Sequence, residues 1–233
     1  MTTSKALCFI PAKAASTRLI KKNILKLDGK ELIYYPIYNG LNAGLFDSYD
    51  VILSTESSEI KAIAEQYGAR VPRLRPEKLA RDPYGVVDVA LDFLSAFPKY
   101  QTYDSICLLS ATAPFTLIED VVGAYEVYHK SGANVVMSVT PTEHSALRSV
   151  YIRKNLVQPV FEEFIFKKSQ ELEPTYRING AVIIVRMKAF LEQKTYFMQP
   201  WGAYMMPLLR SVDIDNQEGY RYAQFLKTKS KVE

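Results

Sequence analysis

The sequence predicts an α/β fold with three layers, αβα, in which helices cover both faces of a mostly parallel β-sheet. Two observations lead to this fold. Short apolar runs of strand length alternate with segments whose apolar residues recur at helical spacing, as on one face of an amphipathic helix. This βα alternation starts near the first residue and is typical of a parallel sheet. A chain of 233 residues can bury a substantial core, so we expect a single domain over residues 1–233.

The expected strands are short and mostly apolar. They lie at residues 6–10, 49–54, 105–109, 134–139, 180–185 and 203–206. Pro11 ends the first strand, and Cys8 and Cys107 lie inside two of the apolar runs. We expect both thiols to be buried and without a redox role. Two such cysteines provide no disulfide framework, which fits a reducing compartment.

The expected helices lie between these strands. Their apolar positions are 37, 41 and 45; 60, 63, 64 and 67; 87, 90, 91 and 94; and 118, 121, 122 and 125, with a last helix from about 216 to 226. Pro36 is acceptable because it lies near a helix start. Ser57 or Ser58 can cap the second helix, and Gly68 can end it. Residues 71–83 contain three prolines and should form an irregular loop.

The alternating pattern breaks between residues 143 and 176. Aromatic and charged residues mix there without periodicity, as at 161–166. We expect this segment, called the excursion below, to form strands that project from the core. Its aromatic residues fit a subunit interface, and they fit equally well an edge elaboration packed on its own domain.

Charge and composition exclude several classes of protein. The net charge of +4 is too small to indicate a nucleic-acid or membrane partner. Hydrophobic residues at 48% and charged residues at 23% are ordinary for a soluble globular protein. No apolar run is long enough to span a membrane, and the first residues do not resemble a signal peptide. We therefore expect a cytoplasmic protein.

The segment after the first strand, residues 11–23, is called the basic loop below. In open parallel sheets, ligands bind beyond the carboxyl ends of the strands, where this loop lies. Its small and basic residues are Ala12, Lys13, Ala14, Ala15, Ser16, Arg18, Lys21 and Lys22. Small residues let the backbone approach a ligand, while successive N–H groups and cations suit a triphosphate. The loop is neither a Walker loop nor a dinucleotide fingerprint. A merely solvated basic loop would carry compensating acids, but between Lys13 and Lys30 the only acid is Asp28.

Asp213 and Asp215 form a second candidate site. If residues 211–215 form a strand, both carboxylates face one side, at a spacing that suits Mg²⁺. The alternative is structural, because Asp215 and Glu218 have the spacing of a helix capping box. The residues alone leave both interpretations open.

Two further segments follow or enter core strands. Arg177 and Asn179 offer hydrogen-bond donors for a carboxylate or hydroxyls, and Gly180 permits close approach of the backbone. A plain turn before a strand explains them equally well. Residues 110–115 follow a central strand and can line the same cleft.

Taken in order, these segments resemble the acylneuraminate cytidylyltransferase family, the enzymes that make CMP-sialic acid and related CMP-nonulosonates. Residues 10–23 resemble the family's CTP loop, I-P-A-R-x-G-S-K-R-x-P-x-K-N. The other matching segments are 54–56 (S-T-D), 75–82 (R-P-x-x-L-A-x-D), 143–148 (E-H-x-x-L-K), 177–181 (R-x-N-G-A) and 211–215 (S-[IV]-D-I-D). The resemblance runs nearly from end to end and implies a Rossmann-like nucleotidyltransferase fold.

The resemblance also implies an activity and residue roles. The reaction would join CTP to an acidic nine-carbon keto sugar, giving a CMP-sugar and pyrophosphate with Mg²⁺ as cofactor. The implied nucleotide-binding residues are Pro11, Ala12, Lys13, Ser16, Arg18, Lys22, Asn23 and Arg75. Asp213 and Asp215 would bind the metal, and Arg18, Lys22 and Asp213 would be catalytic. Thr112, Arg148, Arg177 and Asn179 would face the sugar. The excursion would make a homodimer.

Several positions depart from the family pattern. The loop glycines are Ala14 and Ala15 here, the lysine after the serine is Thr17, and the acid of S-T-D is Glu56. Residues 110–116 lack a glutamine and an arginine found in many members, so the sugar is not assigned. No general base is assigned either, although His144 is a candidate. Two alternatives stay open: a sugar-phosphate nucleotidyltransferase, suggested by residues 17–19 (T-R-L), and a non-catalytic nucleotide-sugar binding protein.

Overall fold

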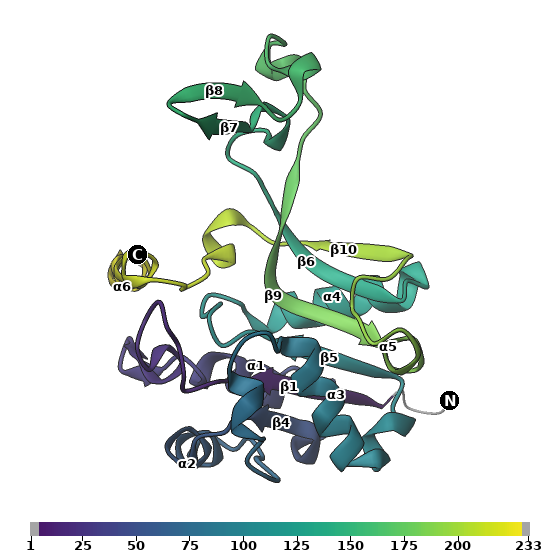
Figure 1. The fold of residues 1–233 in the computed structure, drawn as a ribbon. Coiled ribbons are helices and arrows are strands. Elements are labelled where there is room, and N and C mark those ends of the chain that lie inside the picture. The colour runs from purple at the N-terminus through teal and green to yellow at the C-terminus, as the bar shows by residue number, and fades with distance from the viewer. Residues whose placement is uncertain (1–4, 230–233) are drawn as a thin grey trace.

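The computed structural model describes residues 5–229. Its centre is a sheet of six strands in the order β10-β6-β9-β5-β1-β4 (Figure 1). The strands are β1 (Ala6–Pro11), β4 (Val51–Ser54), β5 (Ser105–Leu109), β6 (Val135–Pro141), β9 (Tyr176–Arg186) and β10 (Trp201–Met205). β1 pairs in parallel with β4 and β5, and β6 pairs in parallel with β10. β9 runs antiparallel between β5 and β6. The predicted mostly parallel α/β sheet is confirmed.

Helices cover both faces of this sheet. They are α1 (Tyr34–Asn42), α2 (Ser58–Gln66), α3 (Val86–Ala96), α4 (Ile118–Ser131), α5 (Met187–Gln193) and α6 (Gln217–Lys229). Successive residues of β1 point to opposite faces, as the pleat requires. Cys8 and Ile10 share a core cluster with residues of α1, α2 and α4, while Leu7 and Phe9 share another with α3 and α5. α6 packs on a third cluster that contains Leu19 of the basic loop.

Several local predictions are confirmed. The Ser57 hydroxyl caps α2 by accepting a hydrogen bond from the Ile60 N–H at 3.3 Å. Gly68 follows this helix with a positive φ of 93°, a conformation that suits glycine. Cys8 and Cys107 are buried and free.

Other boundaries differ from the predictions. α1 ends at Asn42 instead of reaching residue 45, and β4 begins at Val51 because Ser48–Asp50 forms a 3-10 turn. α5 and a small hairpin of β2 (Lys26–Leu27) and β3 (Lys30–Glu31) were not predicted. The expected strand at 211–215 is wrong, since Ser211 ends a 3-10 turn and 212–215 have no regular structure. The remaining 3-10 turns are Lys22–Ile24, Glu77–Ala80, Pro98–Thr102, Ala146–Arg148, Glu162–Phe164 and Ser169–Glu171.

The excursion leaves the sheet after β6 and returns at β9. It contains a separate antiparallel hairpin of β7 (Val150–Arg153) and β8 (Leu156–Pro159), which extends away from the sheet in Figure 1. Large apolar side chains are exposed here: Ile152 is 74% exposed, Leu156 73% and Phe166 96%. Across residues 5–229, no helix combines the length and the apolar character needed to cross a membrane.

Candidate active site

The basic loop follows β1 at the carboxyl edge of the parallel strands, where ligands bind in open α/β sheets. Its two ends are joined, because the Asn23 side-chain amide donates to the Lys13 carbonyl at 2.8 Å. Asn23 is buried, and its role in the structure is to close the loop. Ala12 is also buried, and its N–H donates to the Ser54 carbonyl at 2.9 Å. Neither the Ala12 N–H nor its side chain is therefore free to meet a nucleotide.

A buried ion pair holds the basic loop in place. The Arg75 guanidinium donates to Glu56 Oε2 from Nη2 at 2.8 Å and from Nε at 3.1 Å. Glu56 Oε1 accepts the Ala14 N–H at 2.6 Å, so one carboxylate joins the loop to Arg75. Burial lowers the pKa of Arg75, and the neighbouring Glu56 carboxylate opposes this change. Sequence reasoning gave Glu56 no role beyond its place in the S-T-D segment.

Asp215 lies against the cations of the basic loop. Its carboxylate is 2.8 Å from Lys22 Nζ and 3.1 Å from Arg18 Nη1. The hydrogen bond from Lys22 is the main reason why the pKa of Asp215 is lowered. The capping-box alternative for Asp215 is wrong, because the side chain of Asn216 accepts the Gly219 N–H at 2.9 Å at the start of α6. Asp215 is thus available for a role at the loop.

Asp213 lies beside the same loop. Ile214 is buried between the two aspartates, and its N–H donates to the Thr112 carbonyl at 2.8 Å. Asp213 and Asp215 flank this anchor and stay accessible to solvent. Loss of hydration around the Asp213 carboxyl raises its pKa, a hydrogen bond from Thr112 opposes this, and the charge of Asp215 raises it further. Two close carboxylates of this kind suit a hard divalent cation.

The described residues contain no group of three or more histidine, cysteine or acidic side chains that could hold a metal ion. A magnesium ion at Asp213 and Asp215 would therefore take its other oxygen ligands from water or from the phosphates of a bound substrate. Mg²⁺ commonly binds in this way, through one or two carboxylates plus phosphate oxygens. The donor set fits such a substrate-assisted site.

Most of the predicted nucleotide-binding residues meet in one cavity of about 230 Å³. Its lining residues are Pro11, Lys13, Ser16, Lys22, Asn23, Arg75, Leu79, Tyr84, Gly85, Val86, Val89, Ser110 and Thr112. The Ser16 hydroxyl is buried and has no hydrogen-bond partner among residues 5–229. Tyr84, Gly85 and Val86 were not predicted, because they lie just after the matching segment 75–82 and carry no charged side chain that would mark a ligand contact.

The residues predicted for the sugar do not all lie together. Arg177 and Asp213 line a neighbouring cavity of about 470 Å³ together with His144, and Arg177 donates to the Ser211 carbonyl at 3.3 Å. Arg148 lies in an adjoining hollow of the excursion, which shares residues 141–144 with that cavity, and it donates to the Lys167 carbonyl and to Ser169.

Asn179 does not face either cavity. Its side chain is buried and bonded to Ser138, Ser211 and the Ala181 N–H, so all its polar atoms contact protein groups. A larger, mainly apolar cavity of about 650 Å³ lies between α1 and α6 and contains none of the predicted site residues.

Comparison with known proteins gives consistent matches. Residues 7–229 match the sequence model of a family described as "Cytidylyltransferase". The chain is 34% identical over 226 residues to a pseudaminic acid cytidylyltransferase of Campylobacter jejuni, covering 95% of this chain and 96% of that protein. It is 35% identical over 216 residues to a CMP-N,N'-diacetyllegionaminic acid synthase of Legionella pneumophila, covering 91% of each.

Among solved structures, CMP:2-keto-3-deoxy-manno-octonic acid synthetase complexed with CTP has a TM-score of 0.74 at 13% sequence identity. The match covers 97% of this chain and 100% of that one. At this identity the likeness shows the fold alone, a three-layer α/β arrangement.

Proposed function

The chain belongs to the cytidylyltransferase family, and on that premise we propose that it activates a nonulosonic acid with CTP, giving a CMP-sugar and pyrophosphate. One observation carries the proposal. The cavity at the carboxyl edge of the sheet brings Lys13, Ser16, Lys22 and Arg75 together, directly beside the pair of aspartates. Cations, an unpartnered hydroxyl and carboxylates for a metal are what a magnesium–triphosphate complex requires.

The basic loop would hold the phosphates of CTP. Lys22 and Arg18 contact Asp215 in the structure, so a cation bound there would free both side chains to face phosphate oxygens. Lys13 and the unpartnered Ser16 hydroxyl supply further donors. The cytosine and ribose would occupy the apolar end of the cavity, near Tyr84 and Val86.

Asp213 and Asp215 would hold Mg²⁺, which when bound supplies positive charge against the phosphates. The anomeric hydroxyl oxygen of the sugar forms a bond to the α-phosphorus, and the bond from that phosphorus to the bridging oxygen breaks. Pyrophosphate leaves, and the hydroxyl proton passes to solvent. Arg18 and Lys22 would hold the leaving group, so positioning and charge neutralisation are the protein's main contributions.

Arg177 and Thr112 are the predicted sugar contacts best placed for this reaction, since Arg177 lines the same cavity as Asp213 and Thr112 is hydrogen-bonded to Asp213. Arg177 can meet the sugar carboxylate from the cavity that it shares with His144. Arg148 would contribute from the excursion. We leave Asn179 out of the sugar site because its amide is occupied by protein contacts.

The direct test is a panel assay with CTP and Mg²⁺. N-acetylneuraminic, legionaminic, pseudaminic and 3-deoxy-octulosonic acids and, for comparison, sugar 1-phosphates are offered in turn, and released pyrophosphate is measured. Release with a nonulosonic acid supports the proposal. Release only with sugar 1-phosphates would replace it by the sugar-phosphate alternative, and CTP binding without turnover would indicate a non-catalytic protein.

Asp213→Asn tests the metal site. We expect this variant to lose turnover and to keep the melting temperature of the wild type, because Asp213 makes no ion pair among the described residues. Pyrophosphate release at the wild-type rate would refute the metal assignment.

We also infer a homodimer, with residues 1–233 as one domain and the excursion at the interface. The exposed side chains of Ile152, Leu156 and Phe166 are the support for this, because large apolar groups rarely stay exposed together on a monomer. Sedimentation of the wild type should give a dimer, and Ile152→Asp combined with Leu156→Asp should give a folded monomer. A wild type that is monomeric at micromolar concentration would contradict the inference.

A further inference from the structure

The segment that carries Asp213 and Asp215 has no regular secondary structure of its own. It runs from the 3-10 turn Leu208–Ser211 to α6, and its carboxylates can serve a metal only if other parts of the protein hold it in place. On one side, Ile214 is buried and bonded to the Thr112 carbonyl. On the N-terminal side of Asp213, the segment must be held at Ser211 or at a residue before it.

Ser211 provides part of this hold. Its hydroxyl donates to the Pro207 carbonyl at 2.9 Å and accepts from the Asn179 amide at 2.8 Å. The Asn179 oxygen in turn accepts from the Ser138 hydroxyl at 2.5 Å. This chain of bonds joins the 3-10 turn to β9 and β6 at the centre of the sheet.

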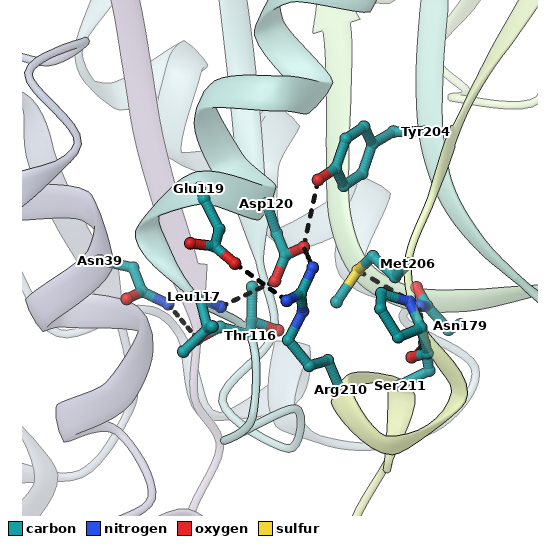
Figure 2. A network of polar contacts seen from close by, with 11 residues as sticks. Asn39, Thr116, Leu117, Glu119, Asp120, Asn179, Tyr204, Met206, Arg210 and Ser211 are labelled. Atoms are coloured by element: carbon teal, nitrogen blue, oxygen red, sulfur yellow. Dashed lines mark hydrogen bonds and ion pairs between the residues drawn. The ribbon is translucent and has the colours of Figure 1, made fainter.

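Arg210 attaches the same turn to α4. Its guanidinium lies 3.0 Å from Asp120 Oδ1 through Nη2, and 2.9 Å from Glu119 Oε1 through Nη1 (Figure 2). Asp120 is completely buried. A carboxylate in such a place needs a cation, and Arg210 supplies that charge.

Asp120 connects three parts of the fold at one point. Its Oδ2 accepts the Leu117 N–H at 2.9 Å, which caps the first turn of α4, and its Oδ1 accepts the Tyr204 hydroxyl of β10 at 3.2 Å. Figure 2 shows Tyr204 and Arg210 meeting at this carboxylate. A carboxylate can cap a helix without being buried. The burial of Asp120 therefore also serves its ion pair with Arg210.

We propose that Arg210 is a positioning residue for the reaction. Through Asp120 it fixes the turn Leu208–Ser211, and so sets where Asp213 and Asp215 stand relative to the basic loop. Arg210 lines the larger cavity between α1 and α6 but neither cavity of the candidate active site, so for this reaction it acts through the segment rather than on a substrate. The proposal rests on the proposed function, because that function assigns the metal to these aspartates.

The test uses the full chain and four variants. Arg210→Met removes the cation, but it also leaves the buried Asp120 carboxylate without a compensating positive charge, which can destabilise the whole fold. Arg210→Met combined with Asp120→Asn removes both charges and keeps a side-chain amide near the helix cap. Arg210→Lys keeps a cation. Tyr204→Phe is the matched control, because it deletes one hydrogen bond to Asp120 and leaves the ion pair in place.

The first measurement is amide hydrogen exchange on the metal-free protein. In the double variant we expect exchange of residues 208–216 to rise about tenfold while amides of β1 and β5 stay protected, since local opening can occur without global unfolding. The Ile214 N–H reports on this segment because it is bonded to Thr112. Tyr204→Phe should leave this exchange within about twofold of the wild type.

The second measurement is Mn²⁺ binding by electron paramagnetic resonance in the presence of CTP, followed by steady-state kinetics. The double variant should bind Mn²⁺ about tenfold more weakly and lose a similar factor in kcat, the usual range for residues that orient metal ligands, with an unchanged KM for CTP. Arg210→Lys should recover part of both losses.

Two outcomes would overturn the proposal: unchanged exchange of 208–216 with unchanged Mn²⁺ binding, or exchange that rises equally throughout the sheet. A wild type without pyrophosphate release would count against the proposed function only, because the exchange experiment needs neither metal nor sugar.

Discussion

Replacing Glu56 with glutamine tests the support beneath the basic loop. Glu56 and Arg75 are almost fully buried, with side chains 9% and 4% exposed, and Glu56 accepts two hydrogen bonds from Arg75 and one from Ala14. Removing one partner of a buried ion pair costs about 3–5 kcal/mol, because the other charge stays buried and uncompensated. Glutamine keeps one acceptor oxygen, so we expect the free energy of unfolding to fall by about 3 kcal/mol, the lower end of this range.

For a domain of this size, such a loss lowers the melting temperature by about 6–12 °C. The assay is thermal unfolding by calorimetry, together with CTP binding by titration calorimetry. CTP binding should also weaken, because the single amide oxygen of glutamine cannot accept from both Arg75 and the Ala14 N–H, as the two carboxylate oxygens do.

Glu59→Gln is the matched control. Glu59 joins the same loop to α2 through Lys21 at 2.8 Å, but both side chains are more than half exposed (58% for Lys21 and 54% for Glu59). An exposed pair contributes less than about 1 kcal/mol, so this variant should melt close to the wild type. A melting temperature for Glu56→Gln no lower than that of Glu59→Gln would refute the reasoning.

Three further predictions concern the fold. In Gly123→Ala the added methyl group would overlap the Tyr204 ring, so we expect the free energy of unfolding, measured with urea, to fall by about 1–3 kcal/mol. A smaller decrease, like that of a typical surface substitution, would contradict this contact. Ser57→Ala removes the cap of α2 and should lower the free energy of unfolding by about 1 kcal/mol in the same assay. An unchanged free energy of unfolding would show that the cap is dispensable. Burial raises the pKa of the Cys8 and Cys107 thiols, so both stay protonated at pH 8 and a thiol reagent should label them only in denaturant. Rapid labelling of the native protein would contradict their burial.

Much of the fold could be predicted because local signals and tertiary structure agree. Ser57 and Gly68 mark both ends of α2, and the alternation of residues 7–10 sends side chains to both faces of the sheet. The direction of β9 could not be predicted, because a strand buried on both faces shows the same apolar run in either direction. α5 has only seven residues, too few for a clear helical period.

The segments that form the candidate site could be predicted from the sequence, but the roles of some of their residues could not. Asp and Asn are equally good helix caps, so the sequence could not show that Asn216 caps α6 while Asp215 meets Lys22 and Arg18. Asn179 was expected to face a sugar, but an amide donor has the same chemistry whether its partner is a ligand or Ser211. These choices depend on contacts between residues far apart in the sequence.

The attachment of the excursion has a consequence for how such a protein can evolve. Pro141 lies opposite Tyr176 at its base, and the Thr142 N–H donates to the Thr175 carbonyl at 3.0 Å, so the chain departs and returns through neighbouring residues of paired strands. Insertions or deletions beyond this junction leave the register of β6 and β9 unaltered. The segment can therefore change in length or sequence while the six-stranded sheet and the basic loop at its carboxyl edge keep their structure.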